Sequence, residues 1–242
     1  MAFSLSPVKS EDVSVLVRRV EFPAHLDSPL RRFMFPLSTE QQWDCNEDEI
    51  KWAIDGIHEA ICRENESLYK ACGADGLPVG LIGWTTCSGV FSKGMINGQN
   101  FIQDDSIINS EERQSRKMGH HDSWTPPSLD VPSWLGISKL LRAERQRVFQ
   151  KWHDNEICRI TFMAVDPDHQ RKGVGSTLLK MLCDIVDKNE LHTFVLSSPD
   201  GVQLYSKFGF EPVGVVETKQ GNFTSMLRNP DLDARKNMEF SL

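Results

Sequence analysis

The sequence predicts a mixed α/β (α+β) fold that spans residues 1–242 as a single domain. Three observations lead to this prediction. Short strand-like and helix-like runs alternate over the front part of the chain. An apolar, β-branched run at Ile157–Val165 is followed by a glycine-containing turn and then by apolar residues at helical spacing from Val174. Two more strand-like runs, at 213–218 and 222–227, close the fold.

The front part begins with a short strand at Phe3–Leu5 and a helix that runs through about Val20. Ser10 is suited to cap this helix, because a serine hydroxyl can accept a hydrogen bond from an N–H group of the first helical turn. The basic and apolar block Leu30–Pro36 follows, and it shows no clear period.

A second helix is expected from about Asn46 to Cys62, because four isoleucines fall on one of its faces. Two strand-like runs at 68–74 and 79–86 are joined by Asp-Gly-Leu-Pro, which is typical of a hairpin. The order strand, helix, helix, strand, strand is therefore expected before residue 88.

Residues 88–151 are interpreted as an insertion between this hairpin and the strand at 157–165. The start of the insertion is rich in Gly, Asn, Asp, Ser and Pro. Its end predicts an amphipathic helix whose apolar side comprises Ile137, Leu140, Leu141, Val148 and Trp152. Long loops in compact domains are usually functional lids or disordered segments. Two alternatives stay open: a lid over a substrate, and a spacer whose helix covers the sheet. A charged tail at 229–242 ends the chain.

Composition excludes several classes of protein. The net charge of −7 at pH 7, without a long basic run, argues against nucleic-acid binding. We find no signal peptide and no apolar stretch long enough to span a membrane. Six single cysteines without a C-x-x-C pair indicate reduced thiols and no structural metal. Gly119–Asp122 holds two histidines without a partner at ligand spacing, so a solvated loop is expected. These features predict a cytoplasmic protein, and they leave open whether it forms a homodimer.

The turn after the strand at 157–165 predicts an anion-binding loop. Gly173 and Gly175 lack a Cβ atom, so a phosphate can approach the main chain closely. Arg171 and Lys172 add positive charge at the same place. The helix that begins here presents free N–H groups, and such helix N-termini bind anions.

The spacing of this loop separates it from two other phosphate loops. It does not fit the Walker pattern G-x-x-x-x-G-K-[ST], and Leu178 stands where a dinucleotide fingerprint needs a third glycine. The loop resembles the acyl-CoA-binding motif [RQ]-x-x-G-x-[GA] of the GNAT superfamily of N-acetyltransferases. The resemblance implies that the pyrophosphate of coenzyme A is held by the motif and its neighbours: Gln170, Arg171, Lys172, Gly173, Val174, Gly175 and Ser176.

The segment downstream resembles a second hallmark of the same superfamily. A strand at His192–Ser197 precedes a short helix expected at Val202–Phe208. The sequence that begins at Ser198 and continues into this helix is S-P-x-G-x-x-L-Y. This motif, together with the long insertion before the CoA-binding strand, is similar to that of a subgroup of the family. The resemblance implies that Ser198 lies at the CoA site and that Tyr205 contacts CoA and protonates its departing thiolate. A phenol can supply that proton; the alternative is a tyrosine that only packs its ring in the core.

The resemblance also implies the GNAT fold, which is a mixed, mostly antiparallel sheet flanked by helices, with splayed strands that hold acetyl-CoA. The splayed strand corresponds to Phe162, Met163, Ala164 and Val165, whose main-chain groups bind pantetheine and donate an N–H to the thioester carbonyl. The acceptor amine attacks directly in a ternary complex. Cys158 and Cys183 are then core thiols and not nucleophiles.

The sequence does not identify the general base that the amine requires. Arg159 and Thr161 on the splayed strand are not bases at neutral pH, and an ion pair is the better interpretation of Arg159. Five other side chains are more typical of solvated positions: His120, His121, His153, Asp154 and Glu156. A water relay is an equal alternative.

Three functions follow from these patterns. The leading one is an N-acetyltransferase that transfers the acetyl group of acetyl-CoA to a small-molecule amine without a metal. The second is a protein acetyltransferase that modifies an N-terminus or a lysine. The third is a non-catalytic CoA-binding or sensing protein, against which the presence of Tyr205 argues.

Overall fold

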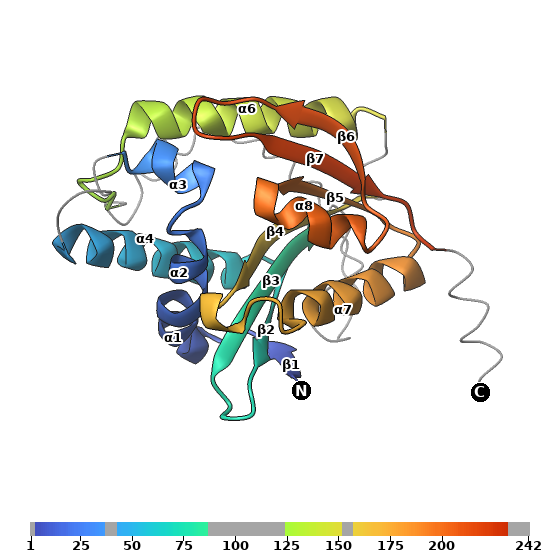
Figure 1. Cartoon of the computed structure of the whole chain (residues 1–242), viewed down its shortest axis with the longest axis horizontal. Coiled ribbons are helices and arrows are strands. Elements are labelled where there is room, and N and C mark those ends of the chain that lie inside the picture. Colours follow the sequence, from blue (N-terminus) through green and yellow to red (C-terminus); the bar gives the residue numbers. More distant parts are fainter. Residues whose placement is uncertain (1–2, 37–42, 87–123, 152–156, 232–242) are drawn as a thin grey trace.

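The computed structural model of the chain describes residues 3–36, 43–86, 124–151 and 157–231. These residues form a seven-stranded sheet in the order β1-β2-β3-β4-β5-β7-β6, with helices on both faces (Figure 1). Every neighbouring pair of strands is antiparallel except β4 and β5, which run parallel. The predicted mixed, mostly antiparallel sheet flanked by helices is therefore confirmed.

Each strand expected from the sequence is present, and the observed ends differ from the expected ones by at most a few residues. The central strand β4 and its neighbour β5 have the expected bounds, because β-branched and apolar residues fill both runs without interruption. The strands are β1 Ser4–Pro7, β2 Glu66–Cys72, β3 Pro78–Thr86, β4 Ile157–Val165, β5 His192–Ser197, β6 Glu211–Val216 and β7 Phe223–Arg228.

Several of the observed helical segments differ from those that the sequence pattern predicts. They are η1 Ser10–Asp12, α1 Val13–Leu16, η2 Val17–Glu21, α2 Phe22–His25, α3 Pro29–Met34, α4 Trp43–Cys62, α6 Val131–Phe149, η5 Pro167–His169, α7 Val174–Lys188 and α8 Pro199–Ser206. Among these described helices, none is both long and apolar enough to cross a lipid bilayer.

The first predicted helix is longer and less regular than expected. It starts after Lys9, whose N–H donates to the Asp12 carboxylate over 2.9 Å, so the expected Ser10 cap is wrong. It then passes through a π turn at η2 and continues through α2 to His25. The block at 30–36, which shows no period, contains the short helix α3. Its Pro29 occupies the first turn and its cap is Ser28, which accepts a hydrogen bond from the Arg31 N–H over 3.2 Å.

The two faces of the sheet carry different helices. On one face, α7 and α8 pack on the central strands and bury Leu178, Leu182 and Phe210 together with Cys158 and Val195. On the other face, α1, η2 and α4 bury a second cluster that includes Val17, Val20, Ile57 and Leu81. Strand β4 contributes residues to both clusters, and the candidate site lies at this strand.

Helix α6 lies along β6, at the opposite end of the sheet from α1 (Figure 1). Its Arg147 donates to the Val213 carbonyl over 2.8 Å, and its Glu144 is hydrogen-bonded to Ser225 of β7. Two of its expected apolar contacts, Ile137 and Val148, are buried. Leu140 is 52% exposed, so its expected place on the buried side is wrong. Residues 88–123 of the insertion and Trp152 lie outside the described residues.

Candidate active site

The centre of the site is a gap between β4 and β5. The two strands pair only over Ile157–Arg159 and His192–Phe194, whereas β4 continues to Val165 alongside β3. Beyond Arg159, no described strand pairs with the β5-facing edge of β4. The main-chain groups of 162–165 that lie on this edge therefore have no partner in a described strand.

A β-bulge marks the place where the strands separate. Ile160 is opposite Trp84 and Phe162 is opposite Gly83, so Thr161 is an extra residue in β4. A Cβ atom on Gly83 would lie 2.8 Å from the Phe162 ring, and the glycine therefore permits the close approach of the two strands. The bulge reorients the side chains that follow it along β4.

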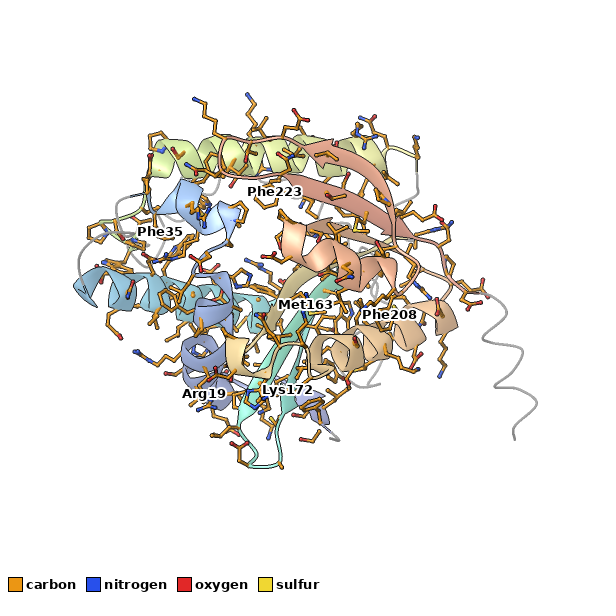
Figure 2. All side chains as sticks on the ribbon, in the orientation of Figure 1. Arg19, Phe35, Met163, Lys172, Phe208 and Phe223 are labelled. Atoms are coloured by element: carbon orange, nitrogen blue, oxygen red, sulfur yellow. The ribbon has the colours of Figure 1, made fainter. Side chains whose placement is uncertain are left out.

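After the bulge, side chains of β4 alternate between the two cores. Met163 and Val165 pack with α7 and α8, whereas Phe162 and Ala164 pack with the cluster under η2 and α2. Figure 2 shows Met163 near the middle of the molecule, between α8 and the loop that precedes α7. The four residues expected to line the acyl-CoA site thus lie at the junction of both layers.

The loop after β4 is held in shape by its own side chains. The Asp166 carboxylate accepts hydrogen bonds of 3.0 Å from the Asp168 N–H and from His169 Nδ1. Gln170 donates its side-chain amide to the Val165 carbonyl over 3.4 Å. Arg171 adopts a left-handed conformation with φ of 59°, which costs about 1–3 kcal/mol for a non-glycine residue. The loop is thereby held in a strained turn.

The turn ends at Gly173, which caps α7 with φ of 90°. A Cβ atom on Gly173 would meet no described atom within 4 Å, so open space adjoins the main chain there. The N–H groups of the first α7 turn have no acceptor within the helix and carry partial positive charge. Arg171 and Lys172 are exposed beside them, and Figure 2 places Lys172 on this loop. The arrangement fits the pyrophosphate of coenzyme A.

Gly175 brings the anion-binding turn against the other parts of the site. A Cβ atom there would lie 3.1 Å from Leu204 of α8 and 3.5 Å from Val165 of β4. Arg171 also reaches α8, where its guanidinium donates to the Gln203 side chain over 3.4 Å. The loop, the end of β4 and α8 are therefore packed into one unit.

Tyr205 lies on α8, which begins at its cap Ser198 and not at Val202 as expected, because Pro199 favours the first helical turn. The Tyr205 side chain is buried and packs on Phe210 with ring centroids 5.4 Å apart. Its hydroxyl has no hydrogen-bond partner among the described residues. Burial raises the pKa of Tyr205 well above its usual value, so the phenol stays protonated at neutral pH. Such a group can donate a proton but cannot serve as a base.

The cysteines near the site are poor nucleophiles. Cys158 and Cys183 are buried, and burial raises the pKa of Cys183 to about 11. A thiol with that pKa is protonated at neutral pH and does not attack a thioester. This chemistry favours direct attack by the acceptor over an acyl-enzyme intermediate.

Of the side chains that the sequence analysis considered for the general base, the structure describes Arg159 and Thr161. Arg159 donates its Nε to the Thr85 hydroxyl over 3.3 Å, and the Thr161 hydroxyl is buried. The remaining five candidates, at positions 120, 121, 153, 154 and 156, lie outside the described residues, as does Gly119–Asp122. Within the described chain, no group of three or more His, Cys, Asp or Glu side chains is arranged to hold a metal.

Sequence reasoning missed one half-buried carboxylate in the segment that packs on β4 from the face opposite α8. Glu21 ends the π turn η2 and is half-buried, although the helix was expected to end at Val20. Burial raises the pKa of Glu21 above its usual value. The available signal was its spacing, because Glu21 follows Val17 by four residues and precedes Ala24 by three, which are neighbouring positions on one helical face.

A separate hollow of about 810 Å³ lies between α3, α6 and the β6–β7 turn. It is lined by no residue of β4, of the loop 166–173 or of α8, so it is distinct from the gap. Leu140 is exposed because its side chain lines this hollow. The lining residues are Arg32, Phe33, Pro36, Asp130, Ser133, Gly136, Ile137, Leu140, Glu217, Thr218, Lys219 and Gln220.

Residues 141–212 match a family model described as acetyltransferase (GNAT) domain. The matched segment runs from the second half of α6 to the start of β6 and contains β4, the loop, α7, β5 and α8. No curated protein sequence matches the chain.

Solved structures share the fold over almost the whole chain. One is described as histone acetyltransferase HPA2 and related acetyltransferase from Corynebacterium glutamicum; it matches with a TM-score of 0.56 and 14% identity, over 96% of this chain and 98% of that one. Another is AAC(6')-Ib, solved with ribostamycin and coenzyme A; its TM-score is 0.50 at 14% identity, over 98% of this chain and 97% of that one. The chain thus has the fold of these acetyltransferases, and with the family model this supports an acyltransferase.

Proposed function

We propose that this protein is an N-acetyltransferase that transfers the acetyl group of acetyl-CoA to the amine of a small-molecule acceptor. The observation that carries the proposal is the gap between β4 and β5, with an anion-binding helix N-terminus and a buried, protonated tyrosine packed around it. Each of these three parts supplies one requirement of acyl transfer from a thioester.

The donor side of the site has the chemistry that coenzyme A needs. The first-turn N–H groups of α7, together with Arg171 and Lys172, bind the pyrophosphate. The unpaired edge at 162–165 offers N–H and C=O groups to the amides of pantetheine, which then occupies the place of a strand. One N–H of this edge donates to the thioester carbonyl and stabilises the negative charge that develops on its oxygen.

In the reaction, the amine nitrogen attacks the carbonyl carbon, so that a C–N bond forms and the C–S bond then breaks. The thiolate that leaves takes a proton from the Tyr205 hydroxyl, which fits a phenol kept protonated by burial. The Tyr205 hydroxyl regains a proton from the acylated nitrogen or from solvent. The protein's part is to bind both substrates, orient them and move protons, since no acyl-enzyme is formed.

Acetyl-CoA turnover tests this proposal directly. Thiol release is measured with a panel of polyamines, aryl- and alkylamines, amino acids, amino sugars and lysine peptides, each beside the Tyr205→Phe variant. Turnover with a small amine that falls in the variant supports the proposal. Turnover restricted to peptides would identify a protein acetyltransferase instead. A protein that binds acetyl-CoA but turns over with no acceptor would be a CoA-binding protein.

A further inference from the structure

Glu21 occupies an unusual position for a carboxylate. It lies in η2, between Val20, which is fully buried, and Phe22, which packs in the same apolar cluster. The Glu21 side chain is 21% exposed. A carboxylate on the apolar side of a helix loses hydration, and proteins retain such groups mainly where they have a chemical task.

The segment that carries Glu21 packs against the splayed part of β4. Both η2 and α2 contact β4, and Figure 1 shows α2 beside this strand. The shared cluster contains Phe162 and Ala164, which belong to the part of β4 that has left β5. Glu21 therefore belongs to a segment that packs on the splayed part of β4, on the face of the sheet opposite α7 and α8.

The backbone at this point is also irregular. The Phe22 N–H donates to the Val17 carbonyl, which is the i→i+5 bond of a π turn. An extra residue in a helical turn rotates the side chains that follow it, and such turns occur frequently at functional sites. Here the π turn ends at Glu21 itself.

Few charges act on Glu21 from the elements packed around it. His25 is the nearest, with Nδ1 3.9 Å from the carboxylate and 2.8 Å from the Glu21 carbonyl oxygen. Arg31 of α3 lies over the Phe22 ring, but its guanidinium is bound by Glu49 of α4 at 2.7 Å.

The other elements leave the charge of Glu21 largely unbalanced. Arg18, on the same helix, forms a bidentate pair with Glu47 of α4 and is neutralised there. The strands contribute apolar side chains to this cluster, among them Leu81 from β3 and Phe162 from β4. Because burial outweighs the attraction of His25, the pKa of Glu21 is raised.

We propose that Glu21 is the catalytic carboxylate that binds the acceptor ammonium and removes its proton before attack. The proposal rests on the acetyl transfer proposed above. In this step the N–H bond of the ammonium breaks, the proton moves to a Glu21 oxygen, and the nitrogen lone pair becomes free to attack the thioester carbon. The proton then leaves Glu21 for solvent.

This role specifies the class of acceptor. A carboxylate that is poorly hydrated and lacks a dedicated cation gains most from a ligand that brings one positive charge. The acceptor is therefore an amine that is cationic at neutral pH. An amine that is already neutral at the assay pH has less need of Glu21.

The kinetic test compares Glu21→Gln with Glu11→Gln, an exposed carboxylate at the start of the same helix. With a cationic amine, Glu21→Gln should lower kcat by about 100-fold or more and remove the acidic limb of the pH profile of kcat/KM. The KM for acetyl-CoA should stay unchanged. With a weakly basic arylamine or hydrazine the loss should be much smaller. Equal losses for both acceptors, or an unchanged pH profile, would overturn the proposal.

A second test needs no turnover. The folded-state pKa of Glu21 is raised above 4.5, so the folded protein binds more protons than the unfolded chain between the two pKa values. The contribution of Glu21 to stability is therefore present at low pH and is lost as pH rises through the folded-state pKa. Glu21→Gln should raise the Tm at pH 8 and leave it nearly unchanged at pH 4, whereas Glu11→Gln should change neither.

The two tests distinguish a failure of the Glu21 proposal from a failure of the proposed acetyl transfer. If the wild-type protein releases no thiol with any acceptor, the proposed transferase function fails. A Tm that falls at pH 8 in Glu21→Gln would show that the carboxylate is a structural anchor, and would overturn the catalytic role whatever the turnover.

Discussion

Gly80 determines how closely α7, the helix of the proposed anion-binding site, approaches the sheet. It lies on β3 opposite Val165, and a Cβ atom there would sit 2.5 Å from Val174 Cγ1 and 2.9 Å from Leu178 Cδ1. Both contacts come from the first turns of α7. Carbon atoms pack at about 3.5–4.0 Å, so Gly80→Ala must displace this end of α7 by about 1 Å.

The size of the effect follows from this displacement. Overpacking a filled core costs about 1–3 kcal/mol of unfolding free energy. A shift of about 1 Å in a group that positions substrate lowers turnover by about 100-fold. We therefore expect Gly80→Ala to lose about 1–3 kcal/mol of stability in urea unfolding. In calorimetric titration we expect coenzyme A to bind about tenfold more weakly, which is about 1.4 kcal/mol.

Gly56→Ala is the matched control for this substitution. Gly56 lies inside α4, and a Cβ atom there would meet nothing within 4 Å, so the alanine should raise stability by about 0.5–1 kcal/mol through helix propensity. The reasoning fails if Gly80→Ala unfolds at the same urea concentration as the wild type and binds coenzyme A equally well.

Three further predictions use other parts of the site and of the fold. Gly173→Glu should abolish coenzyme A binding in titration, because the new carboxylate repels the pyrophosphate. Gly76→Glu, at another left-handed glycine with open space around it, should bind coenzyme A normally. Similar binding by both variants would refute the placement of the loop. Tyr205→Phe should lower kcat by about 100-fold or more without changing the affinity for coenzyme A, and unchanged turnover would leave Tyr205 a packing residue. Asp187→Ala should cost about 3–5 kcal/mol, or about 6–20 °C in Tm, because it leaves the Arg228 guanidinium buried without its partner at 2.6 Å. The exposed Asp184→Ala should leave Tm nearly unchanged, and equal Tm losses in the two would contradict this account.

The parts of the site that a local pattern encodes were predictable. The strand at 157–165, the turn with Gly173 and the helix after it are consecutive in the sequence. Several hydrogen bonds that shape the turn join residues at most five positions apart, such as Gln170 to Val165 and His169 to Asp166. Tyr205 was predictable for a similar reason, since the helix that carries it is defined by the proline and glycines around it.

The parts that depend on distant contacts were not predictable. Leu140 fits an apolar helical face, yet it faces a hollow bordered by α3 and the β6–β7 turn. The helix α3 has too few residues to show a period, and it is fixed by its Ser28 cap and by the ion pair of Arg31 with Glu49. Glu49 lies outside the window that a periodic pattern samples, whereas the Ser28 cap and Pro29 are local signals that the search for a period did not use.

By itself the sequence determined the mixed sheet, the glycine turn that starts α7 and the position of Tyr205 on a short helix. These features arise from residue types at fixed short spacings, because backbone conformation and helix ends respond to neighbouring residues. Only the tertiary structure decided that Glu21 is half-buried and lies in a segment packed against β4. More than 130 residues separate Glu21 from Phe162, and the burial that raises its pKa exists only once the helix and the strand have packed together.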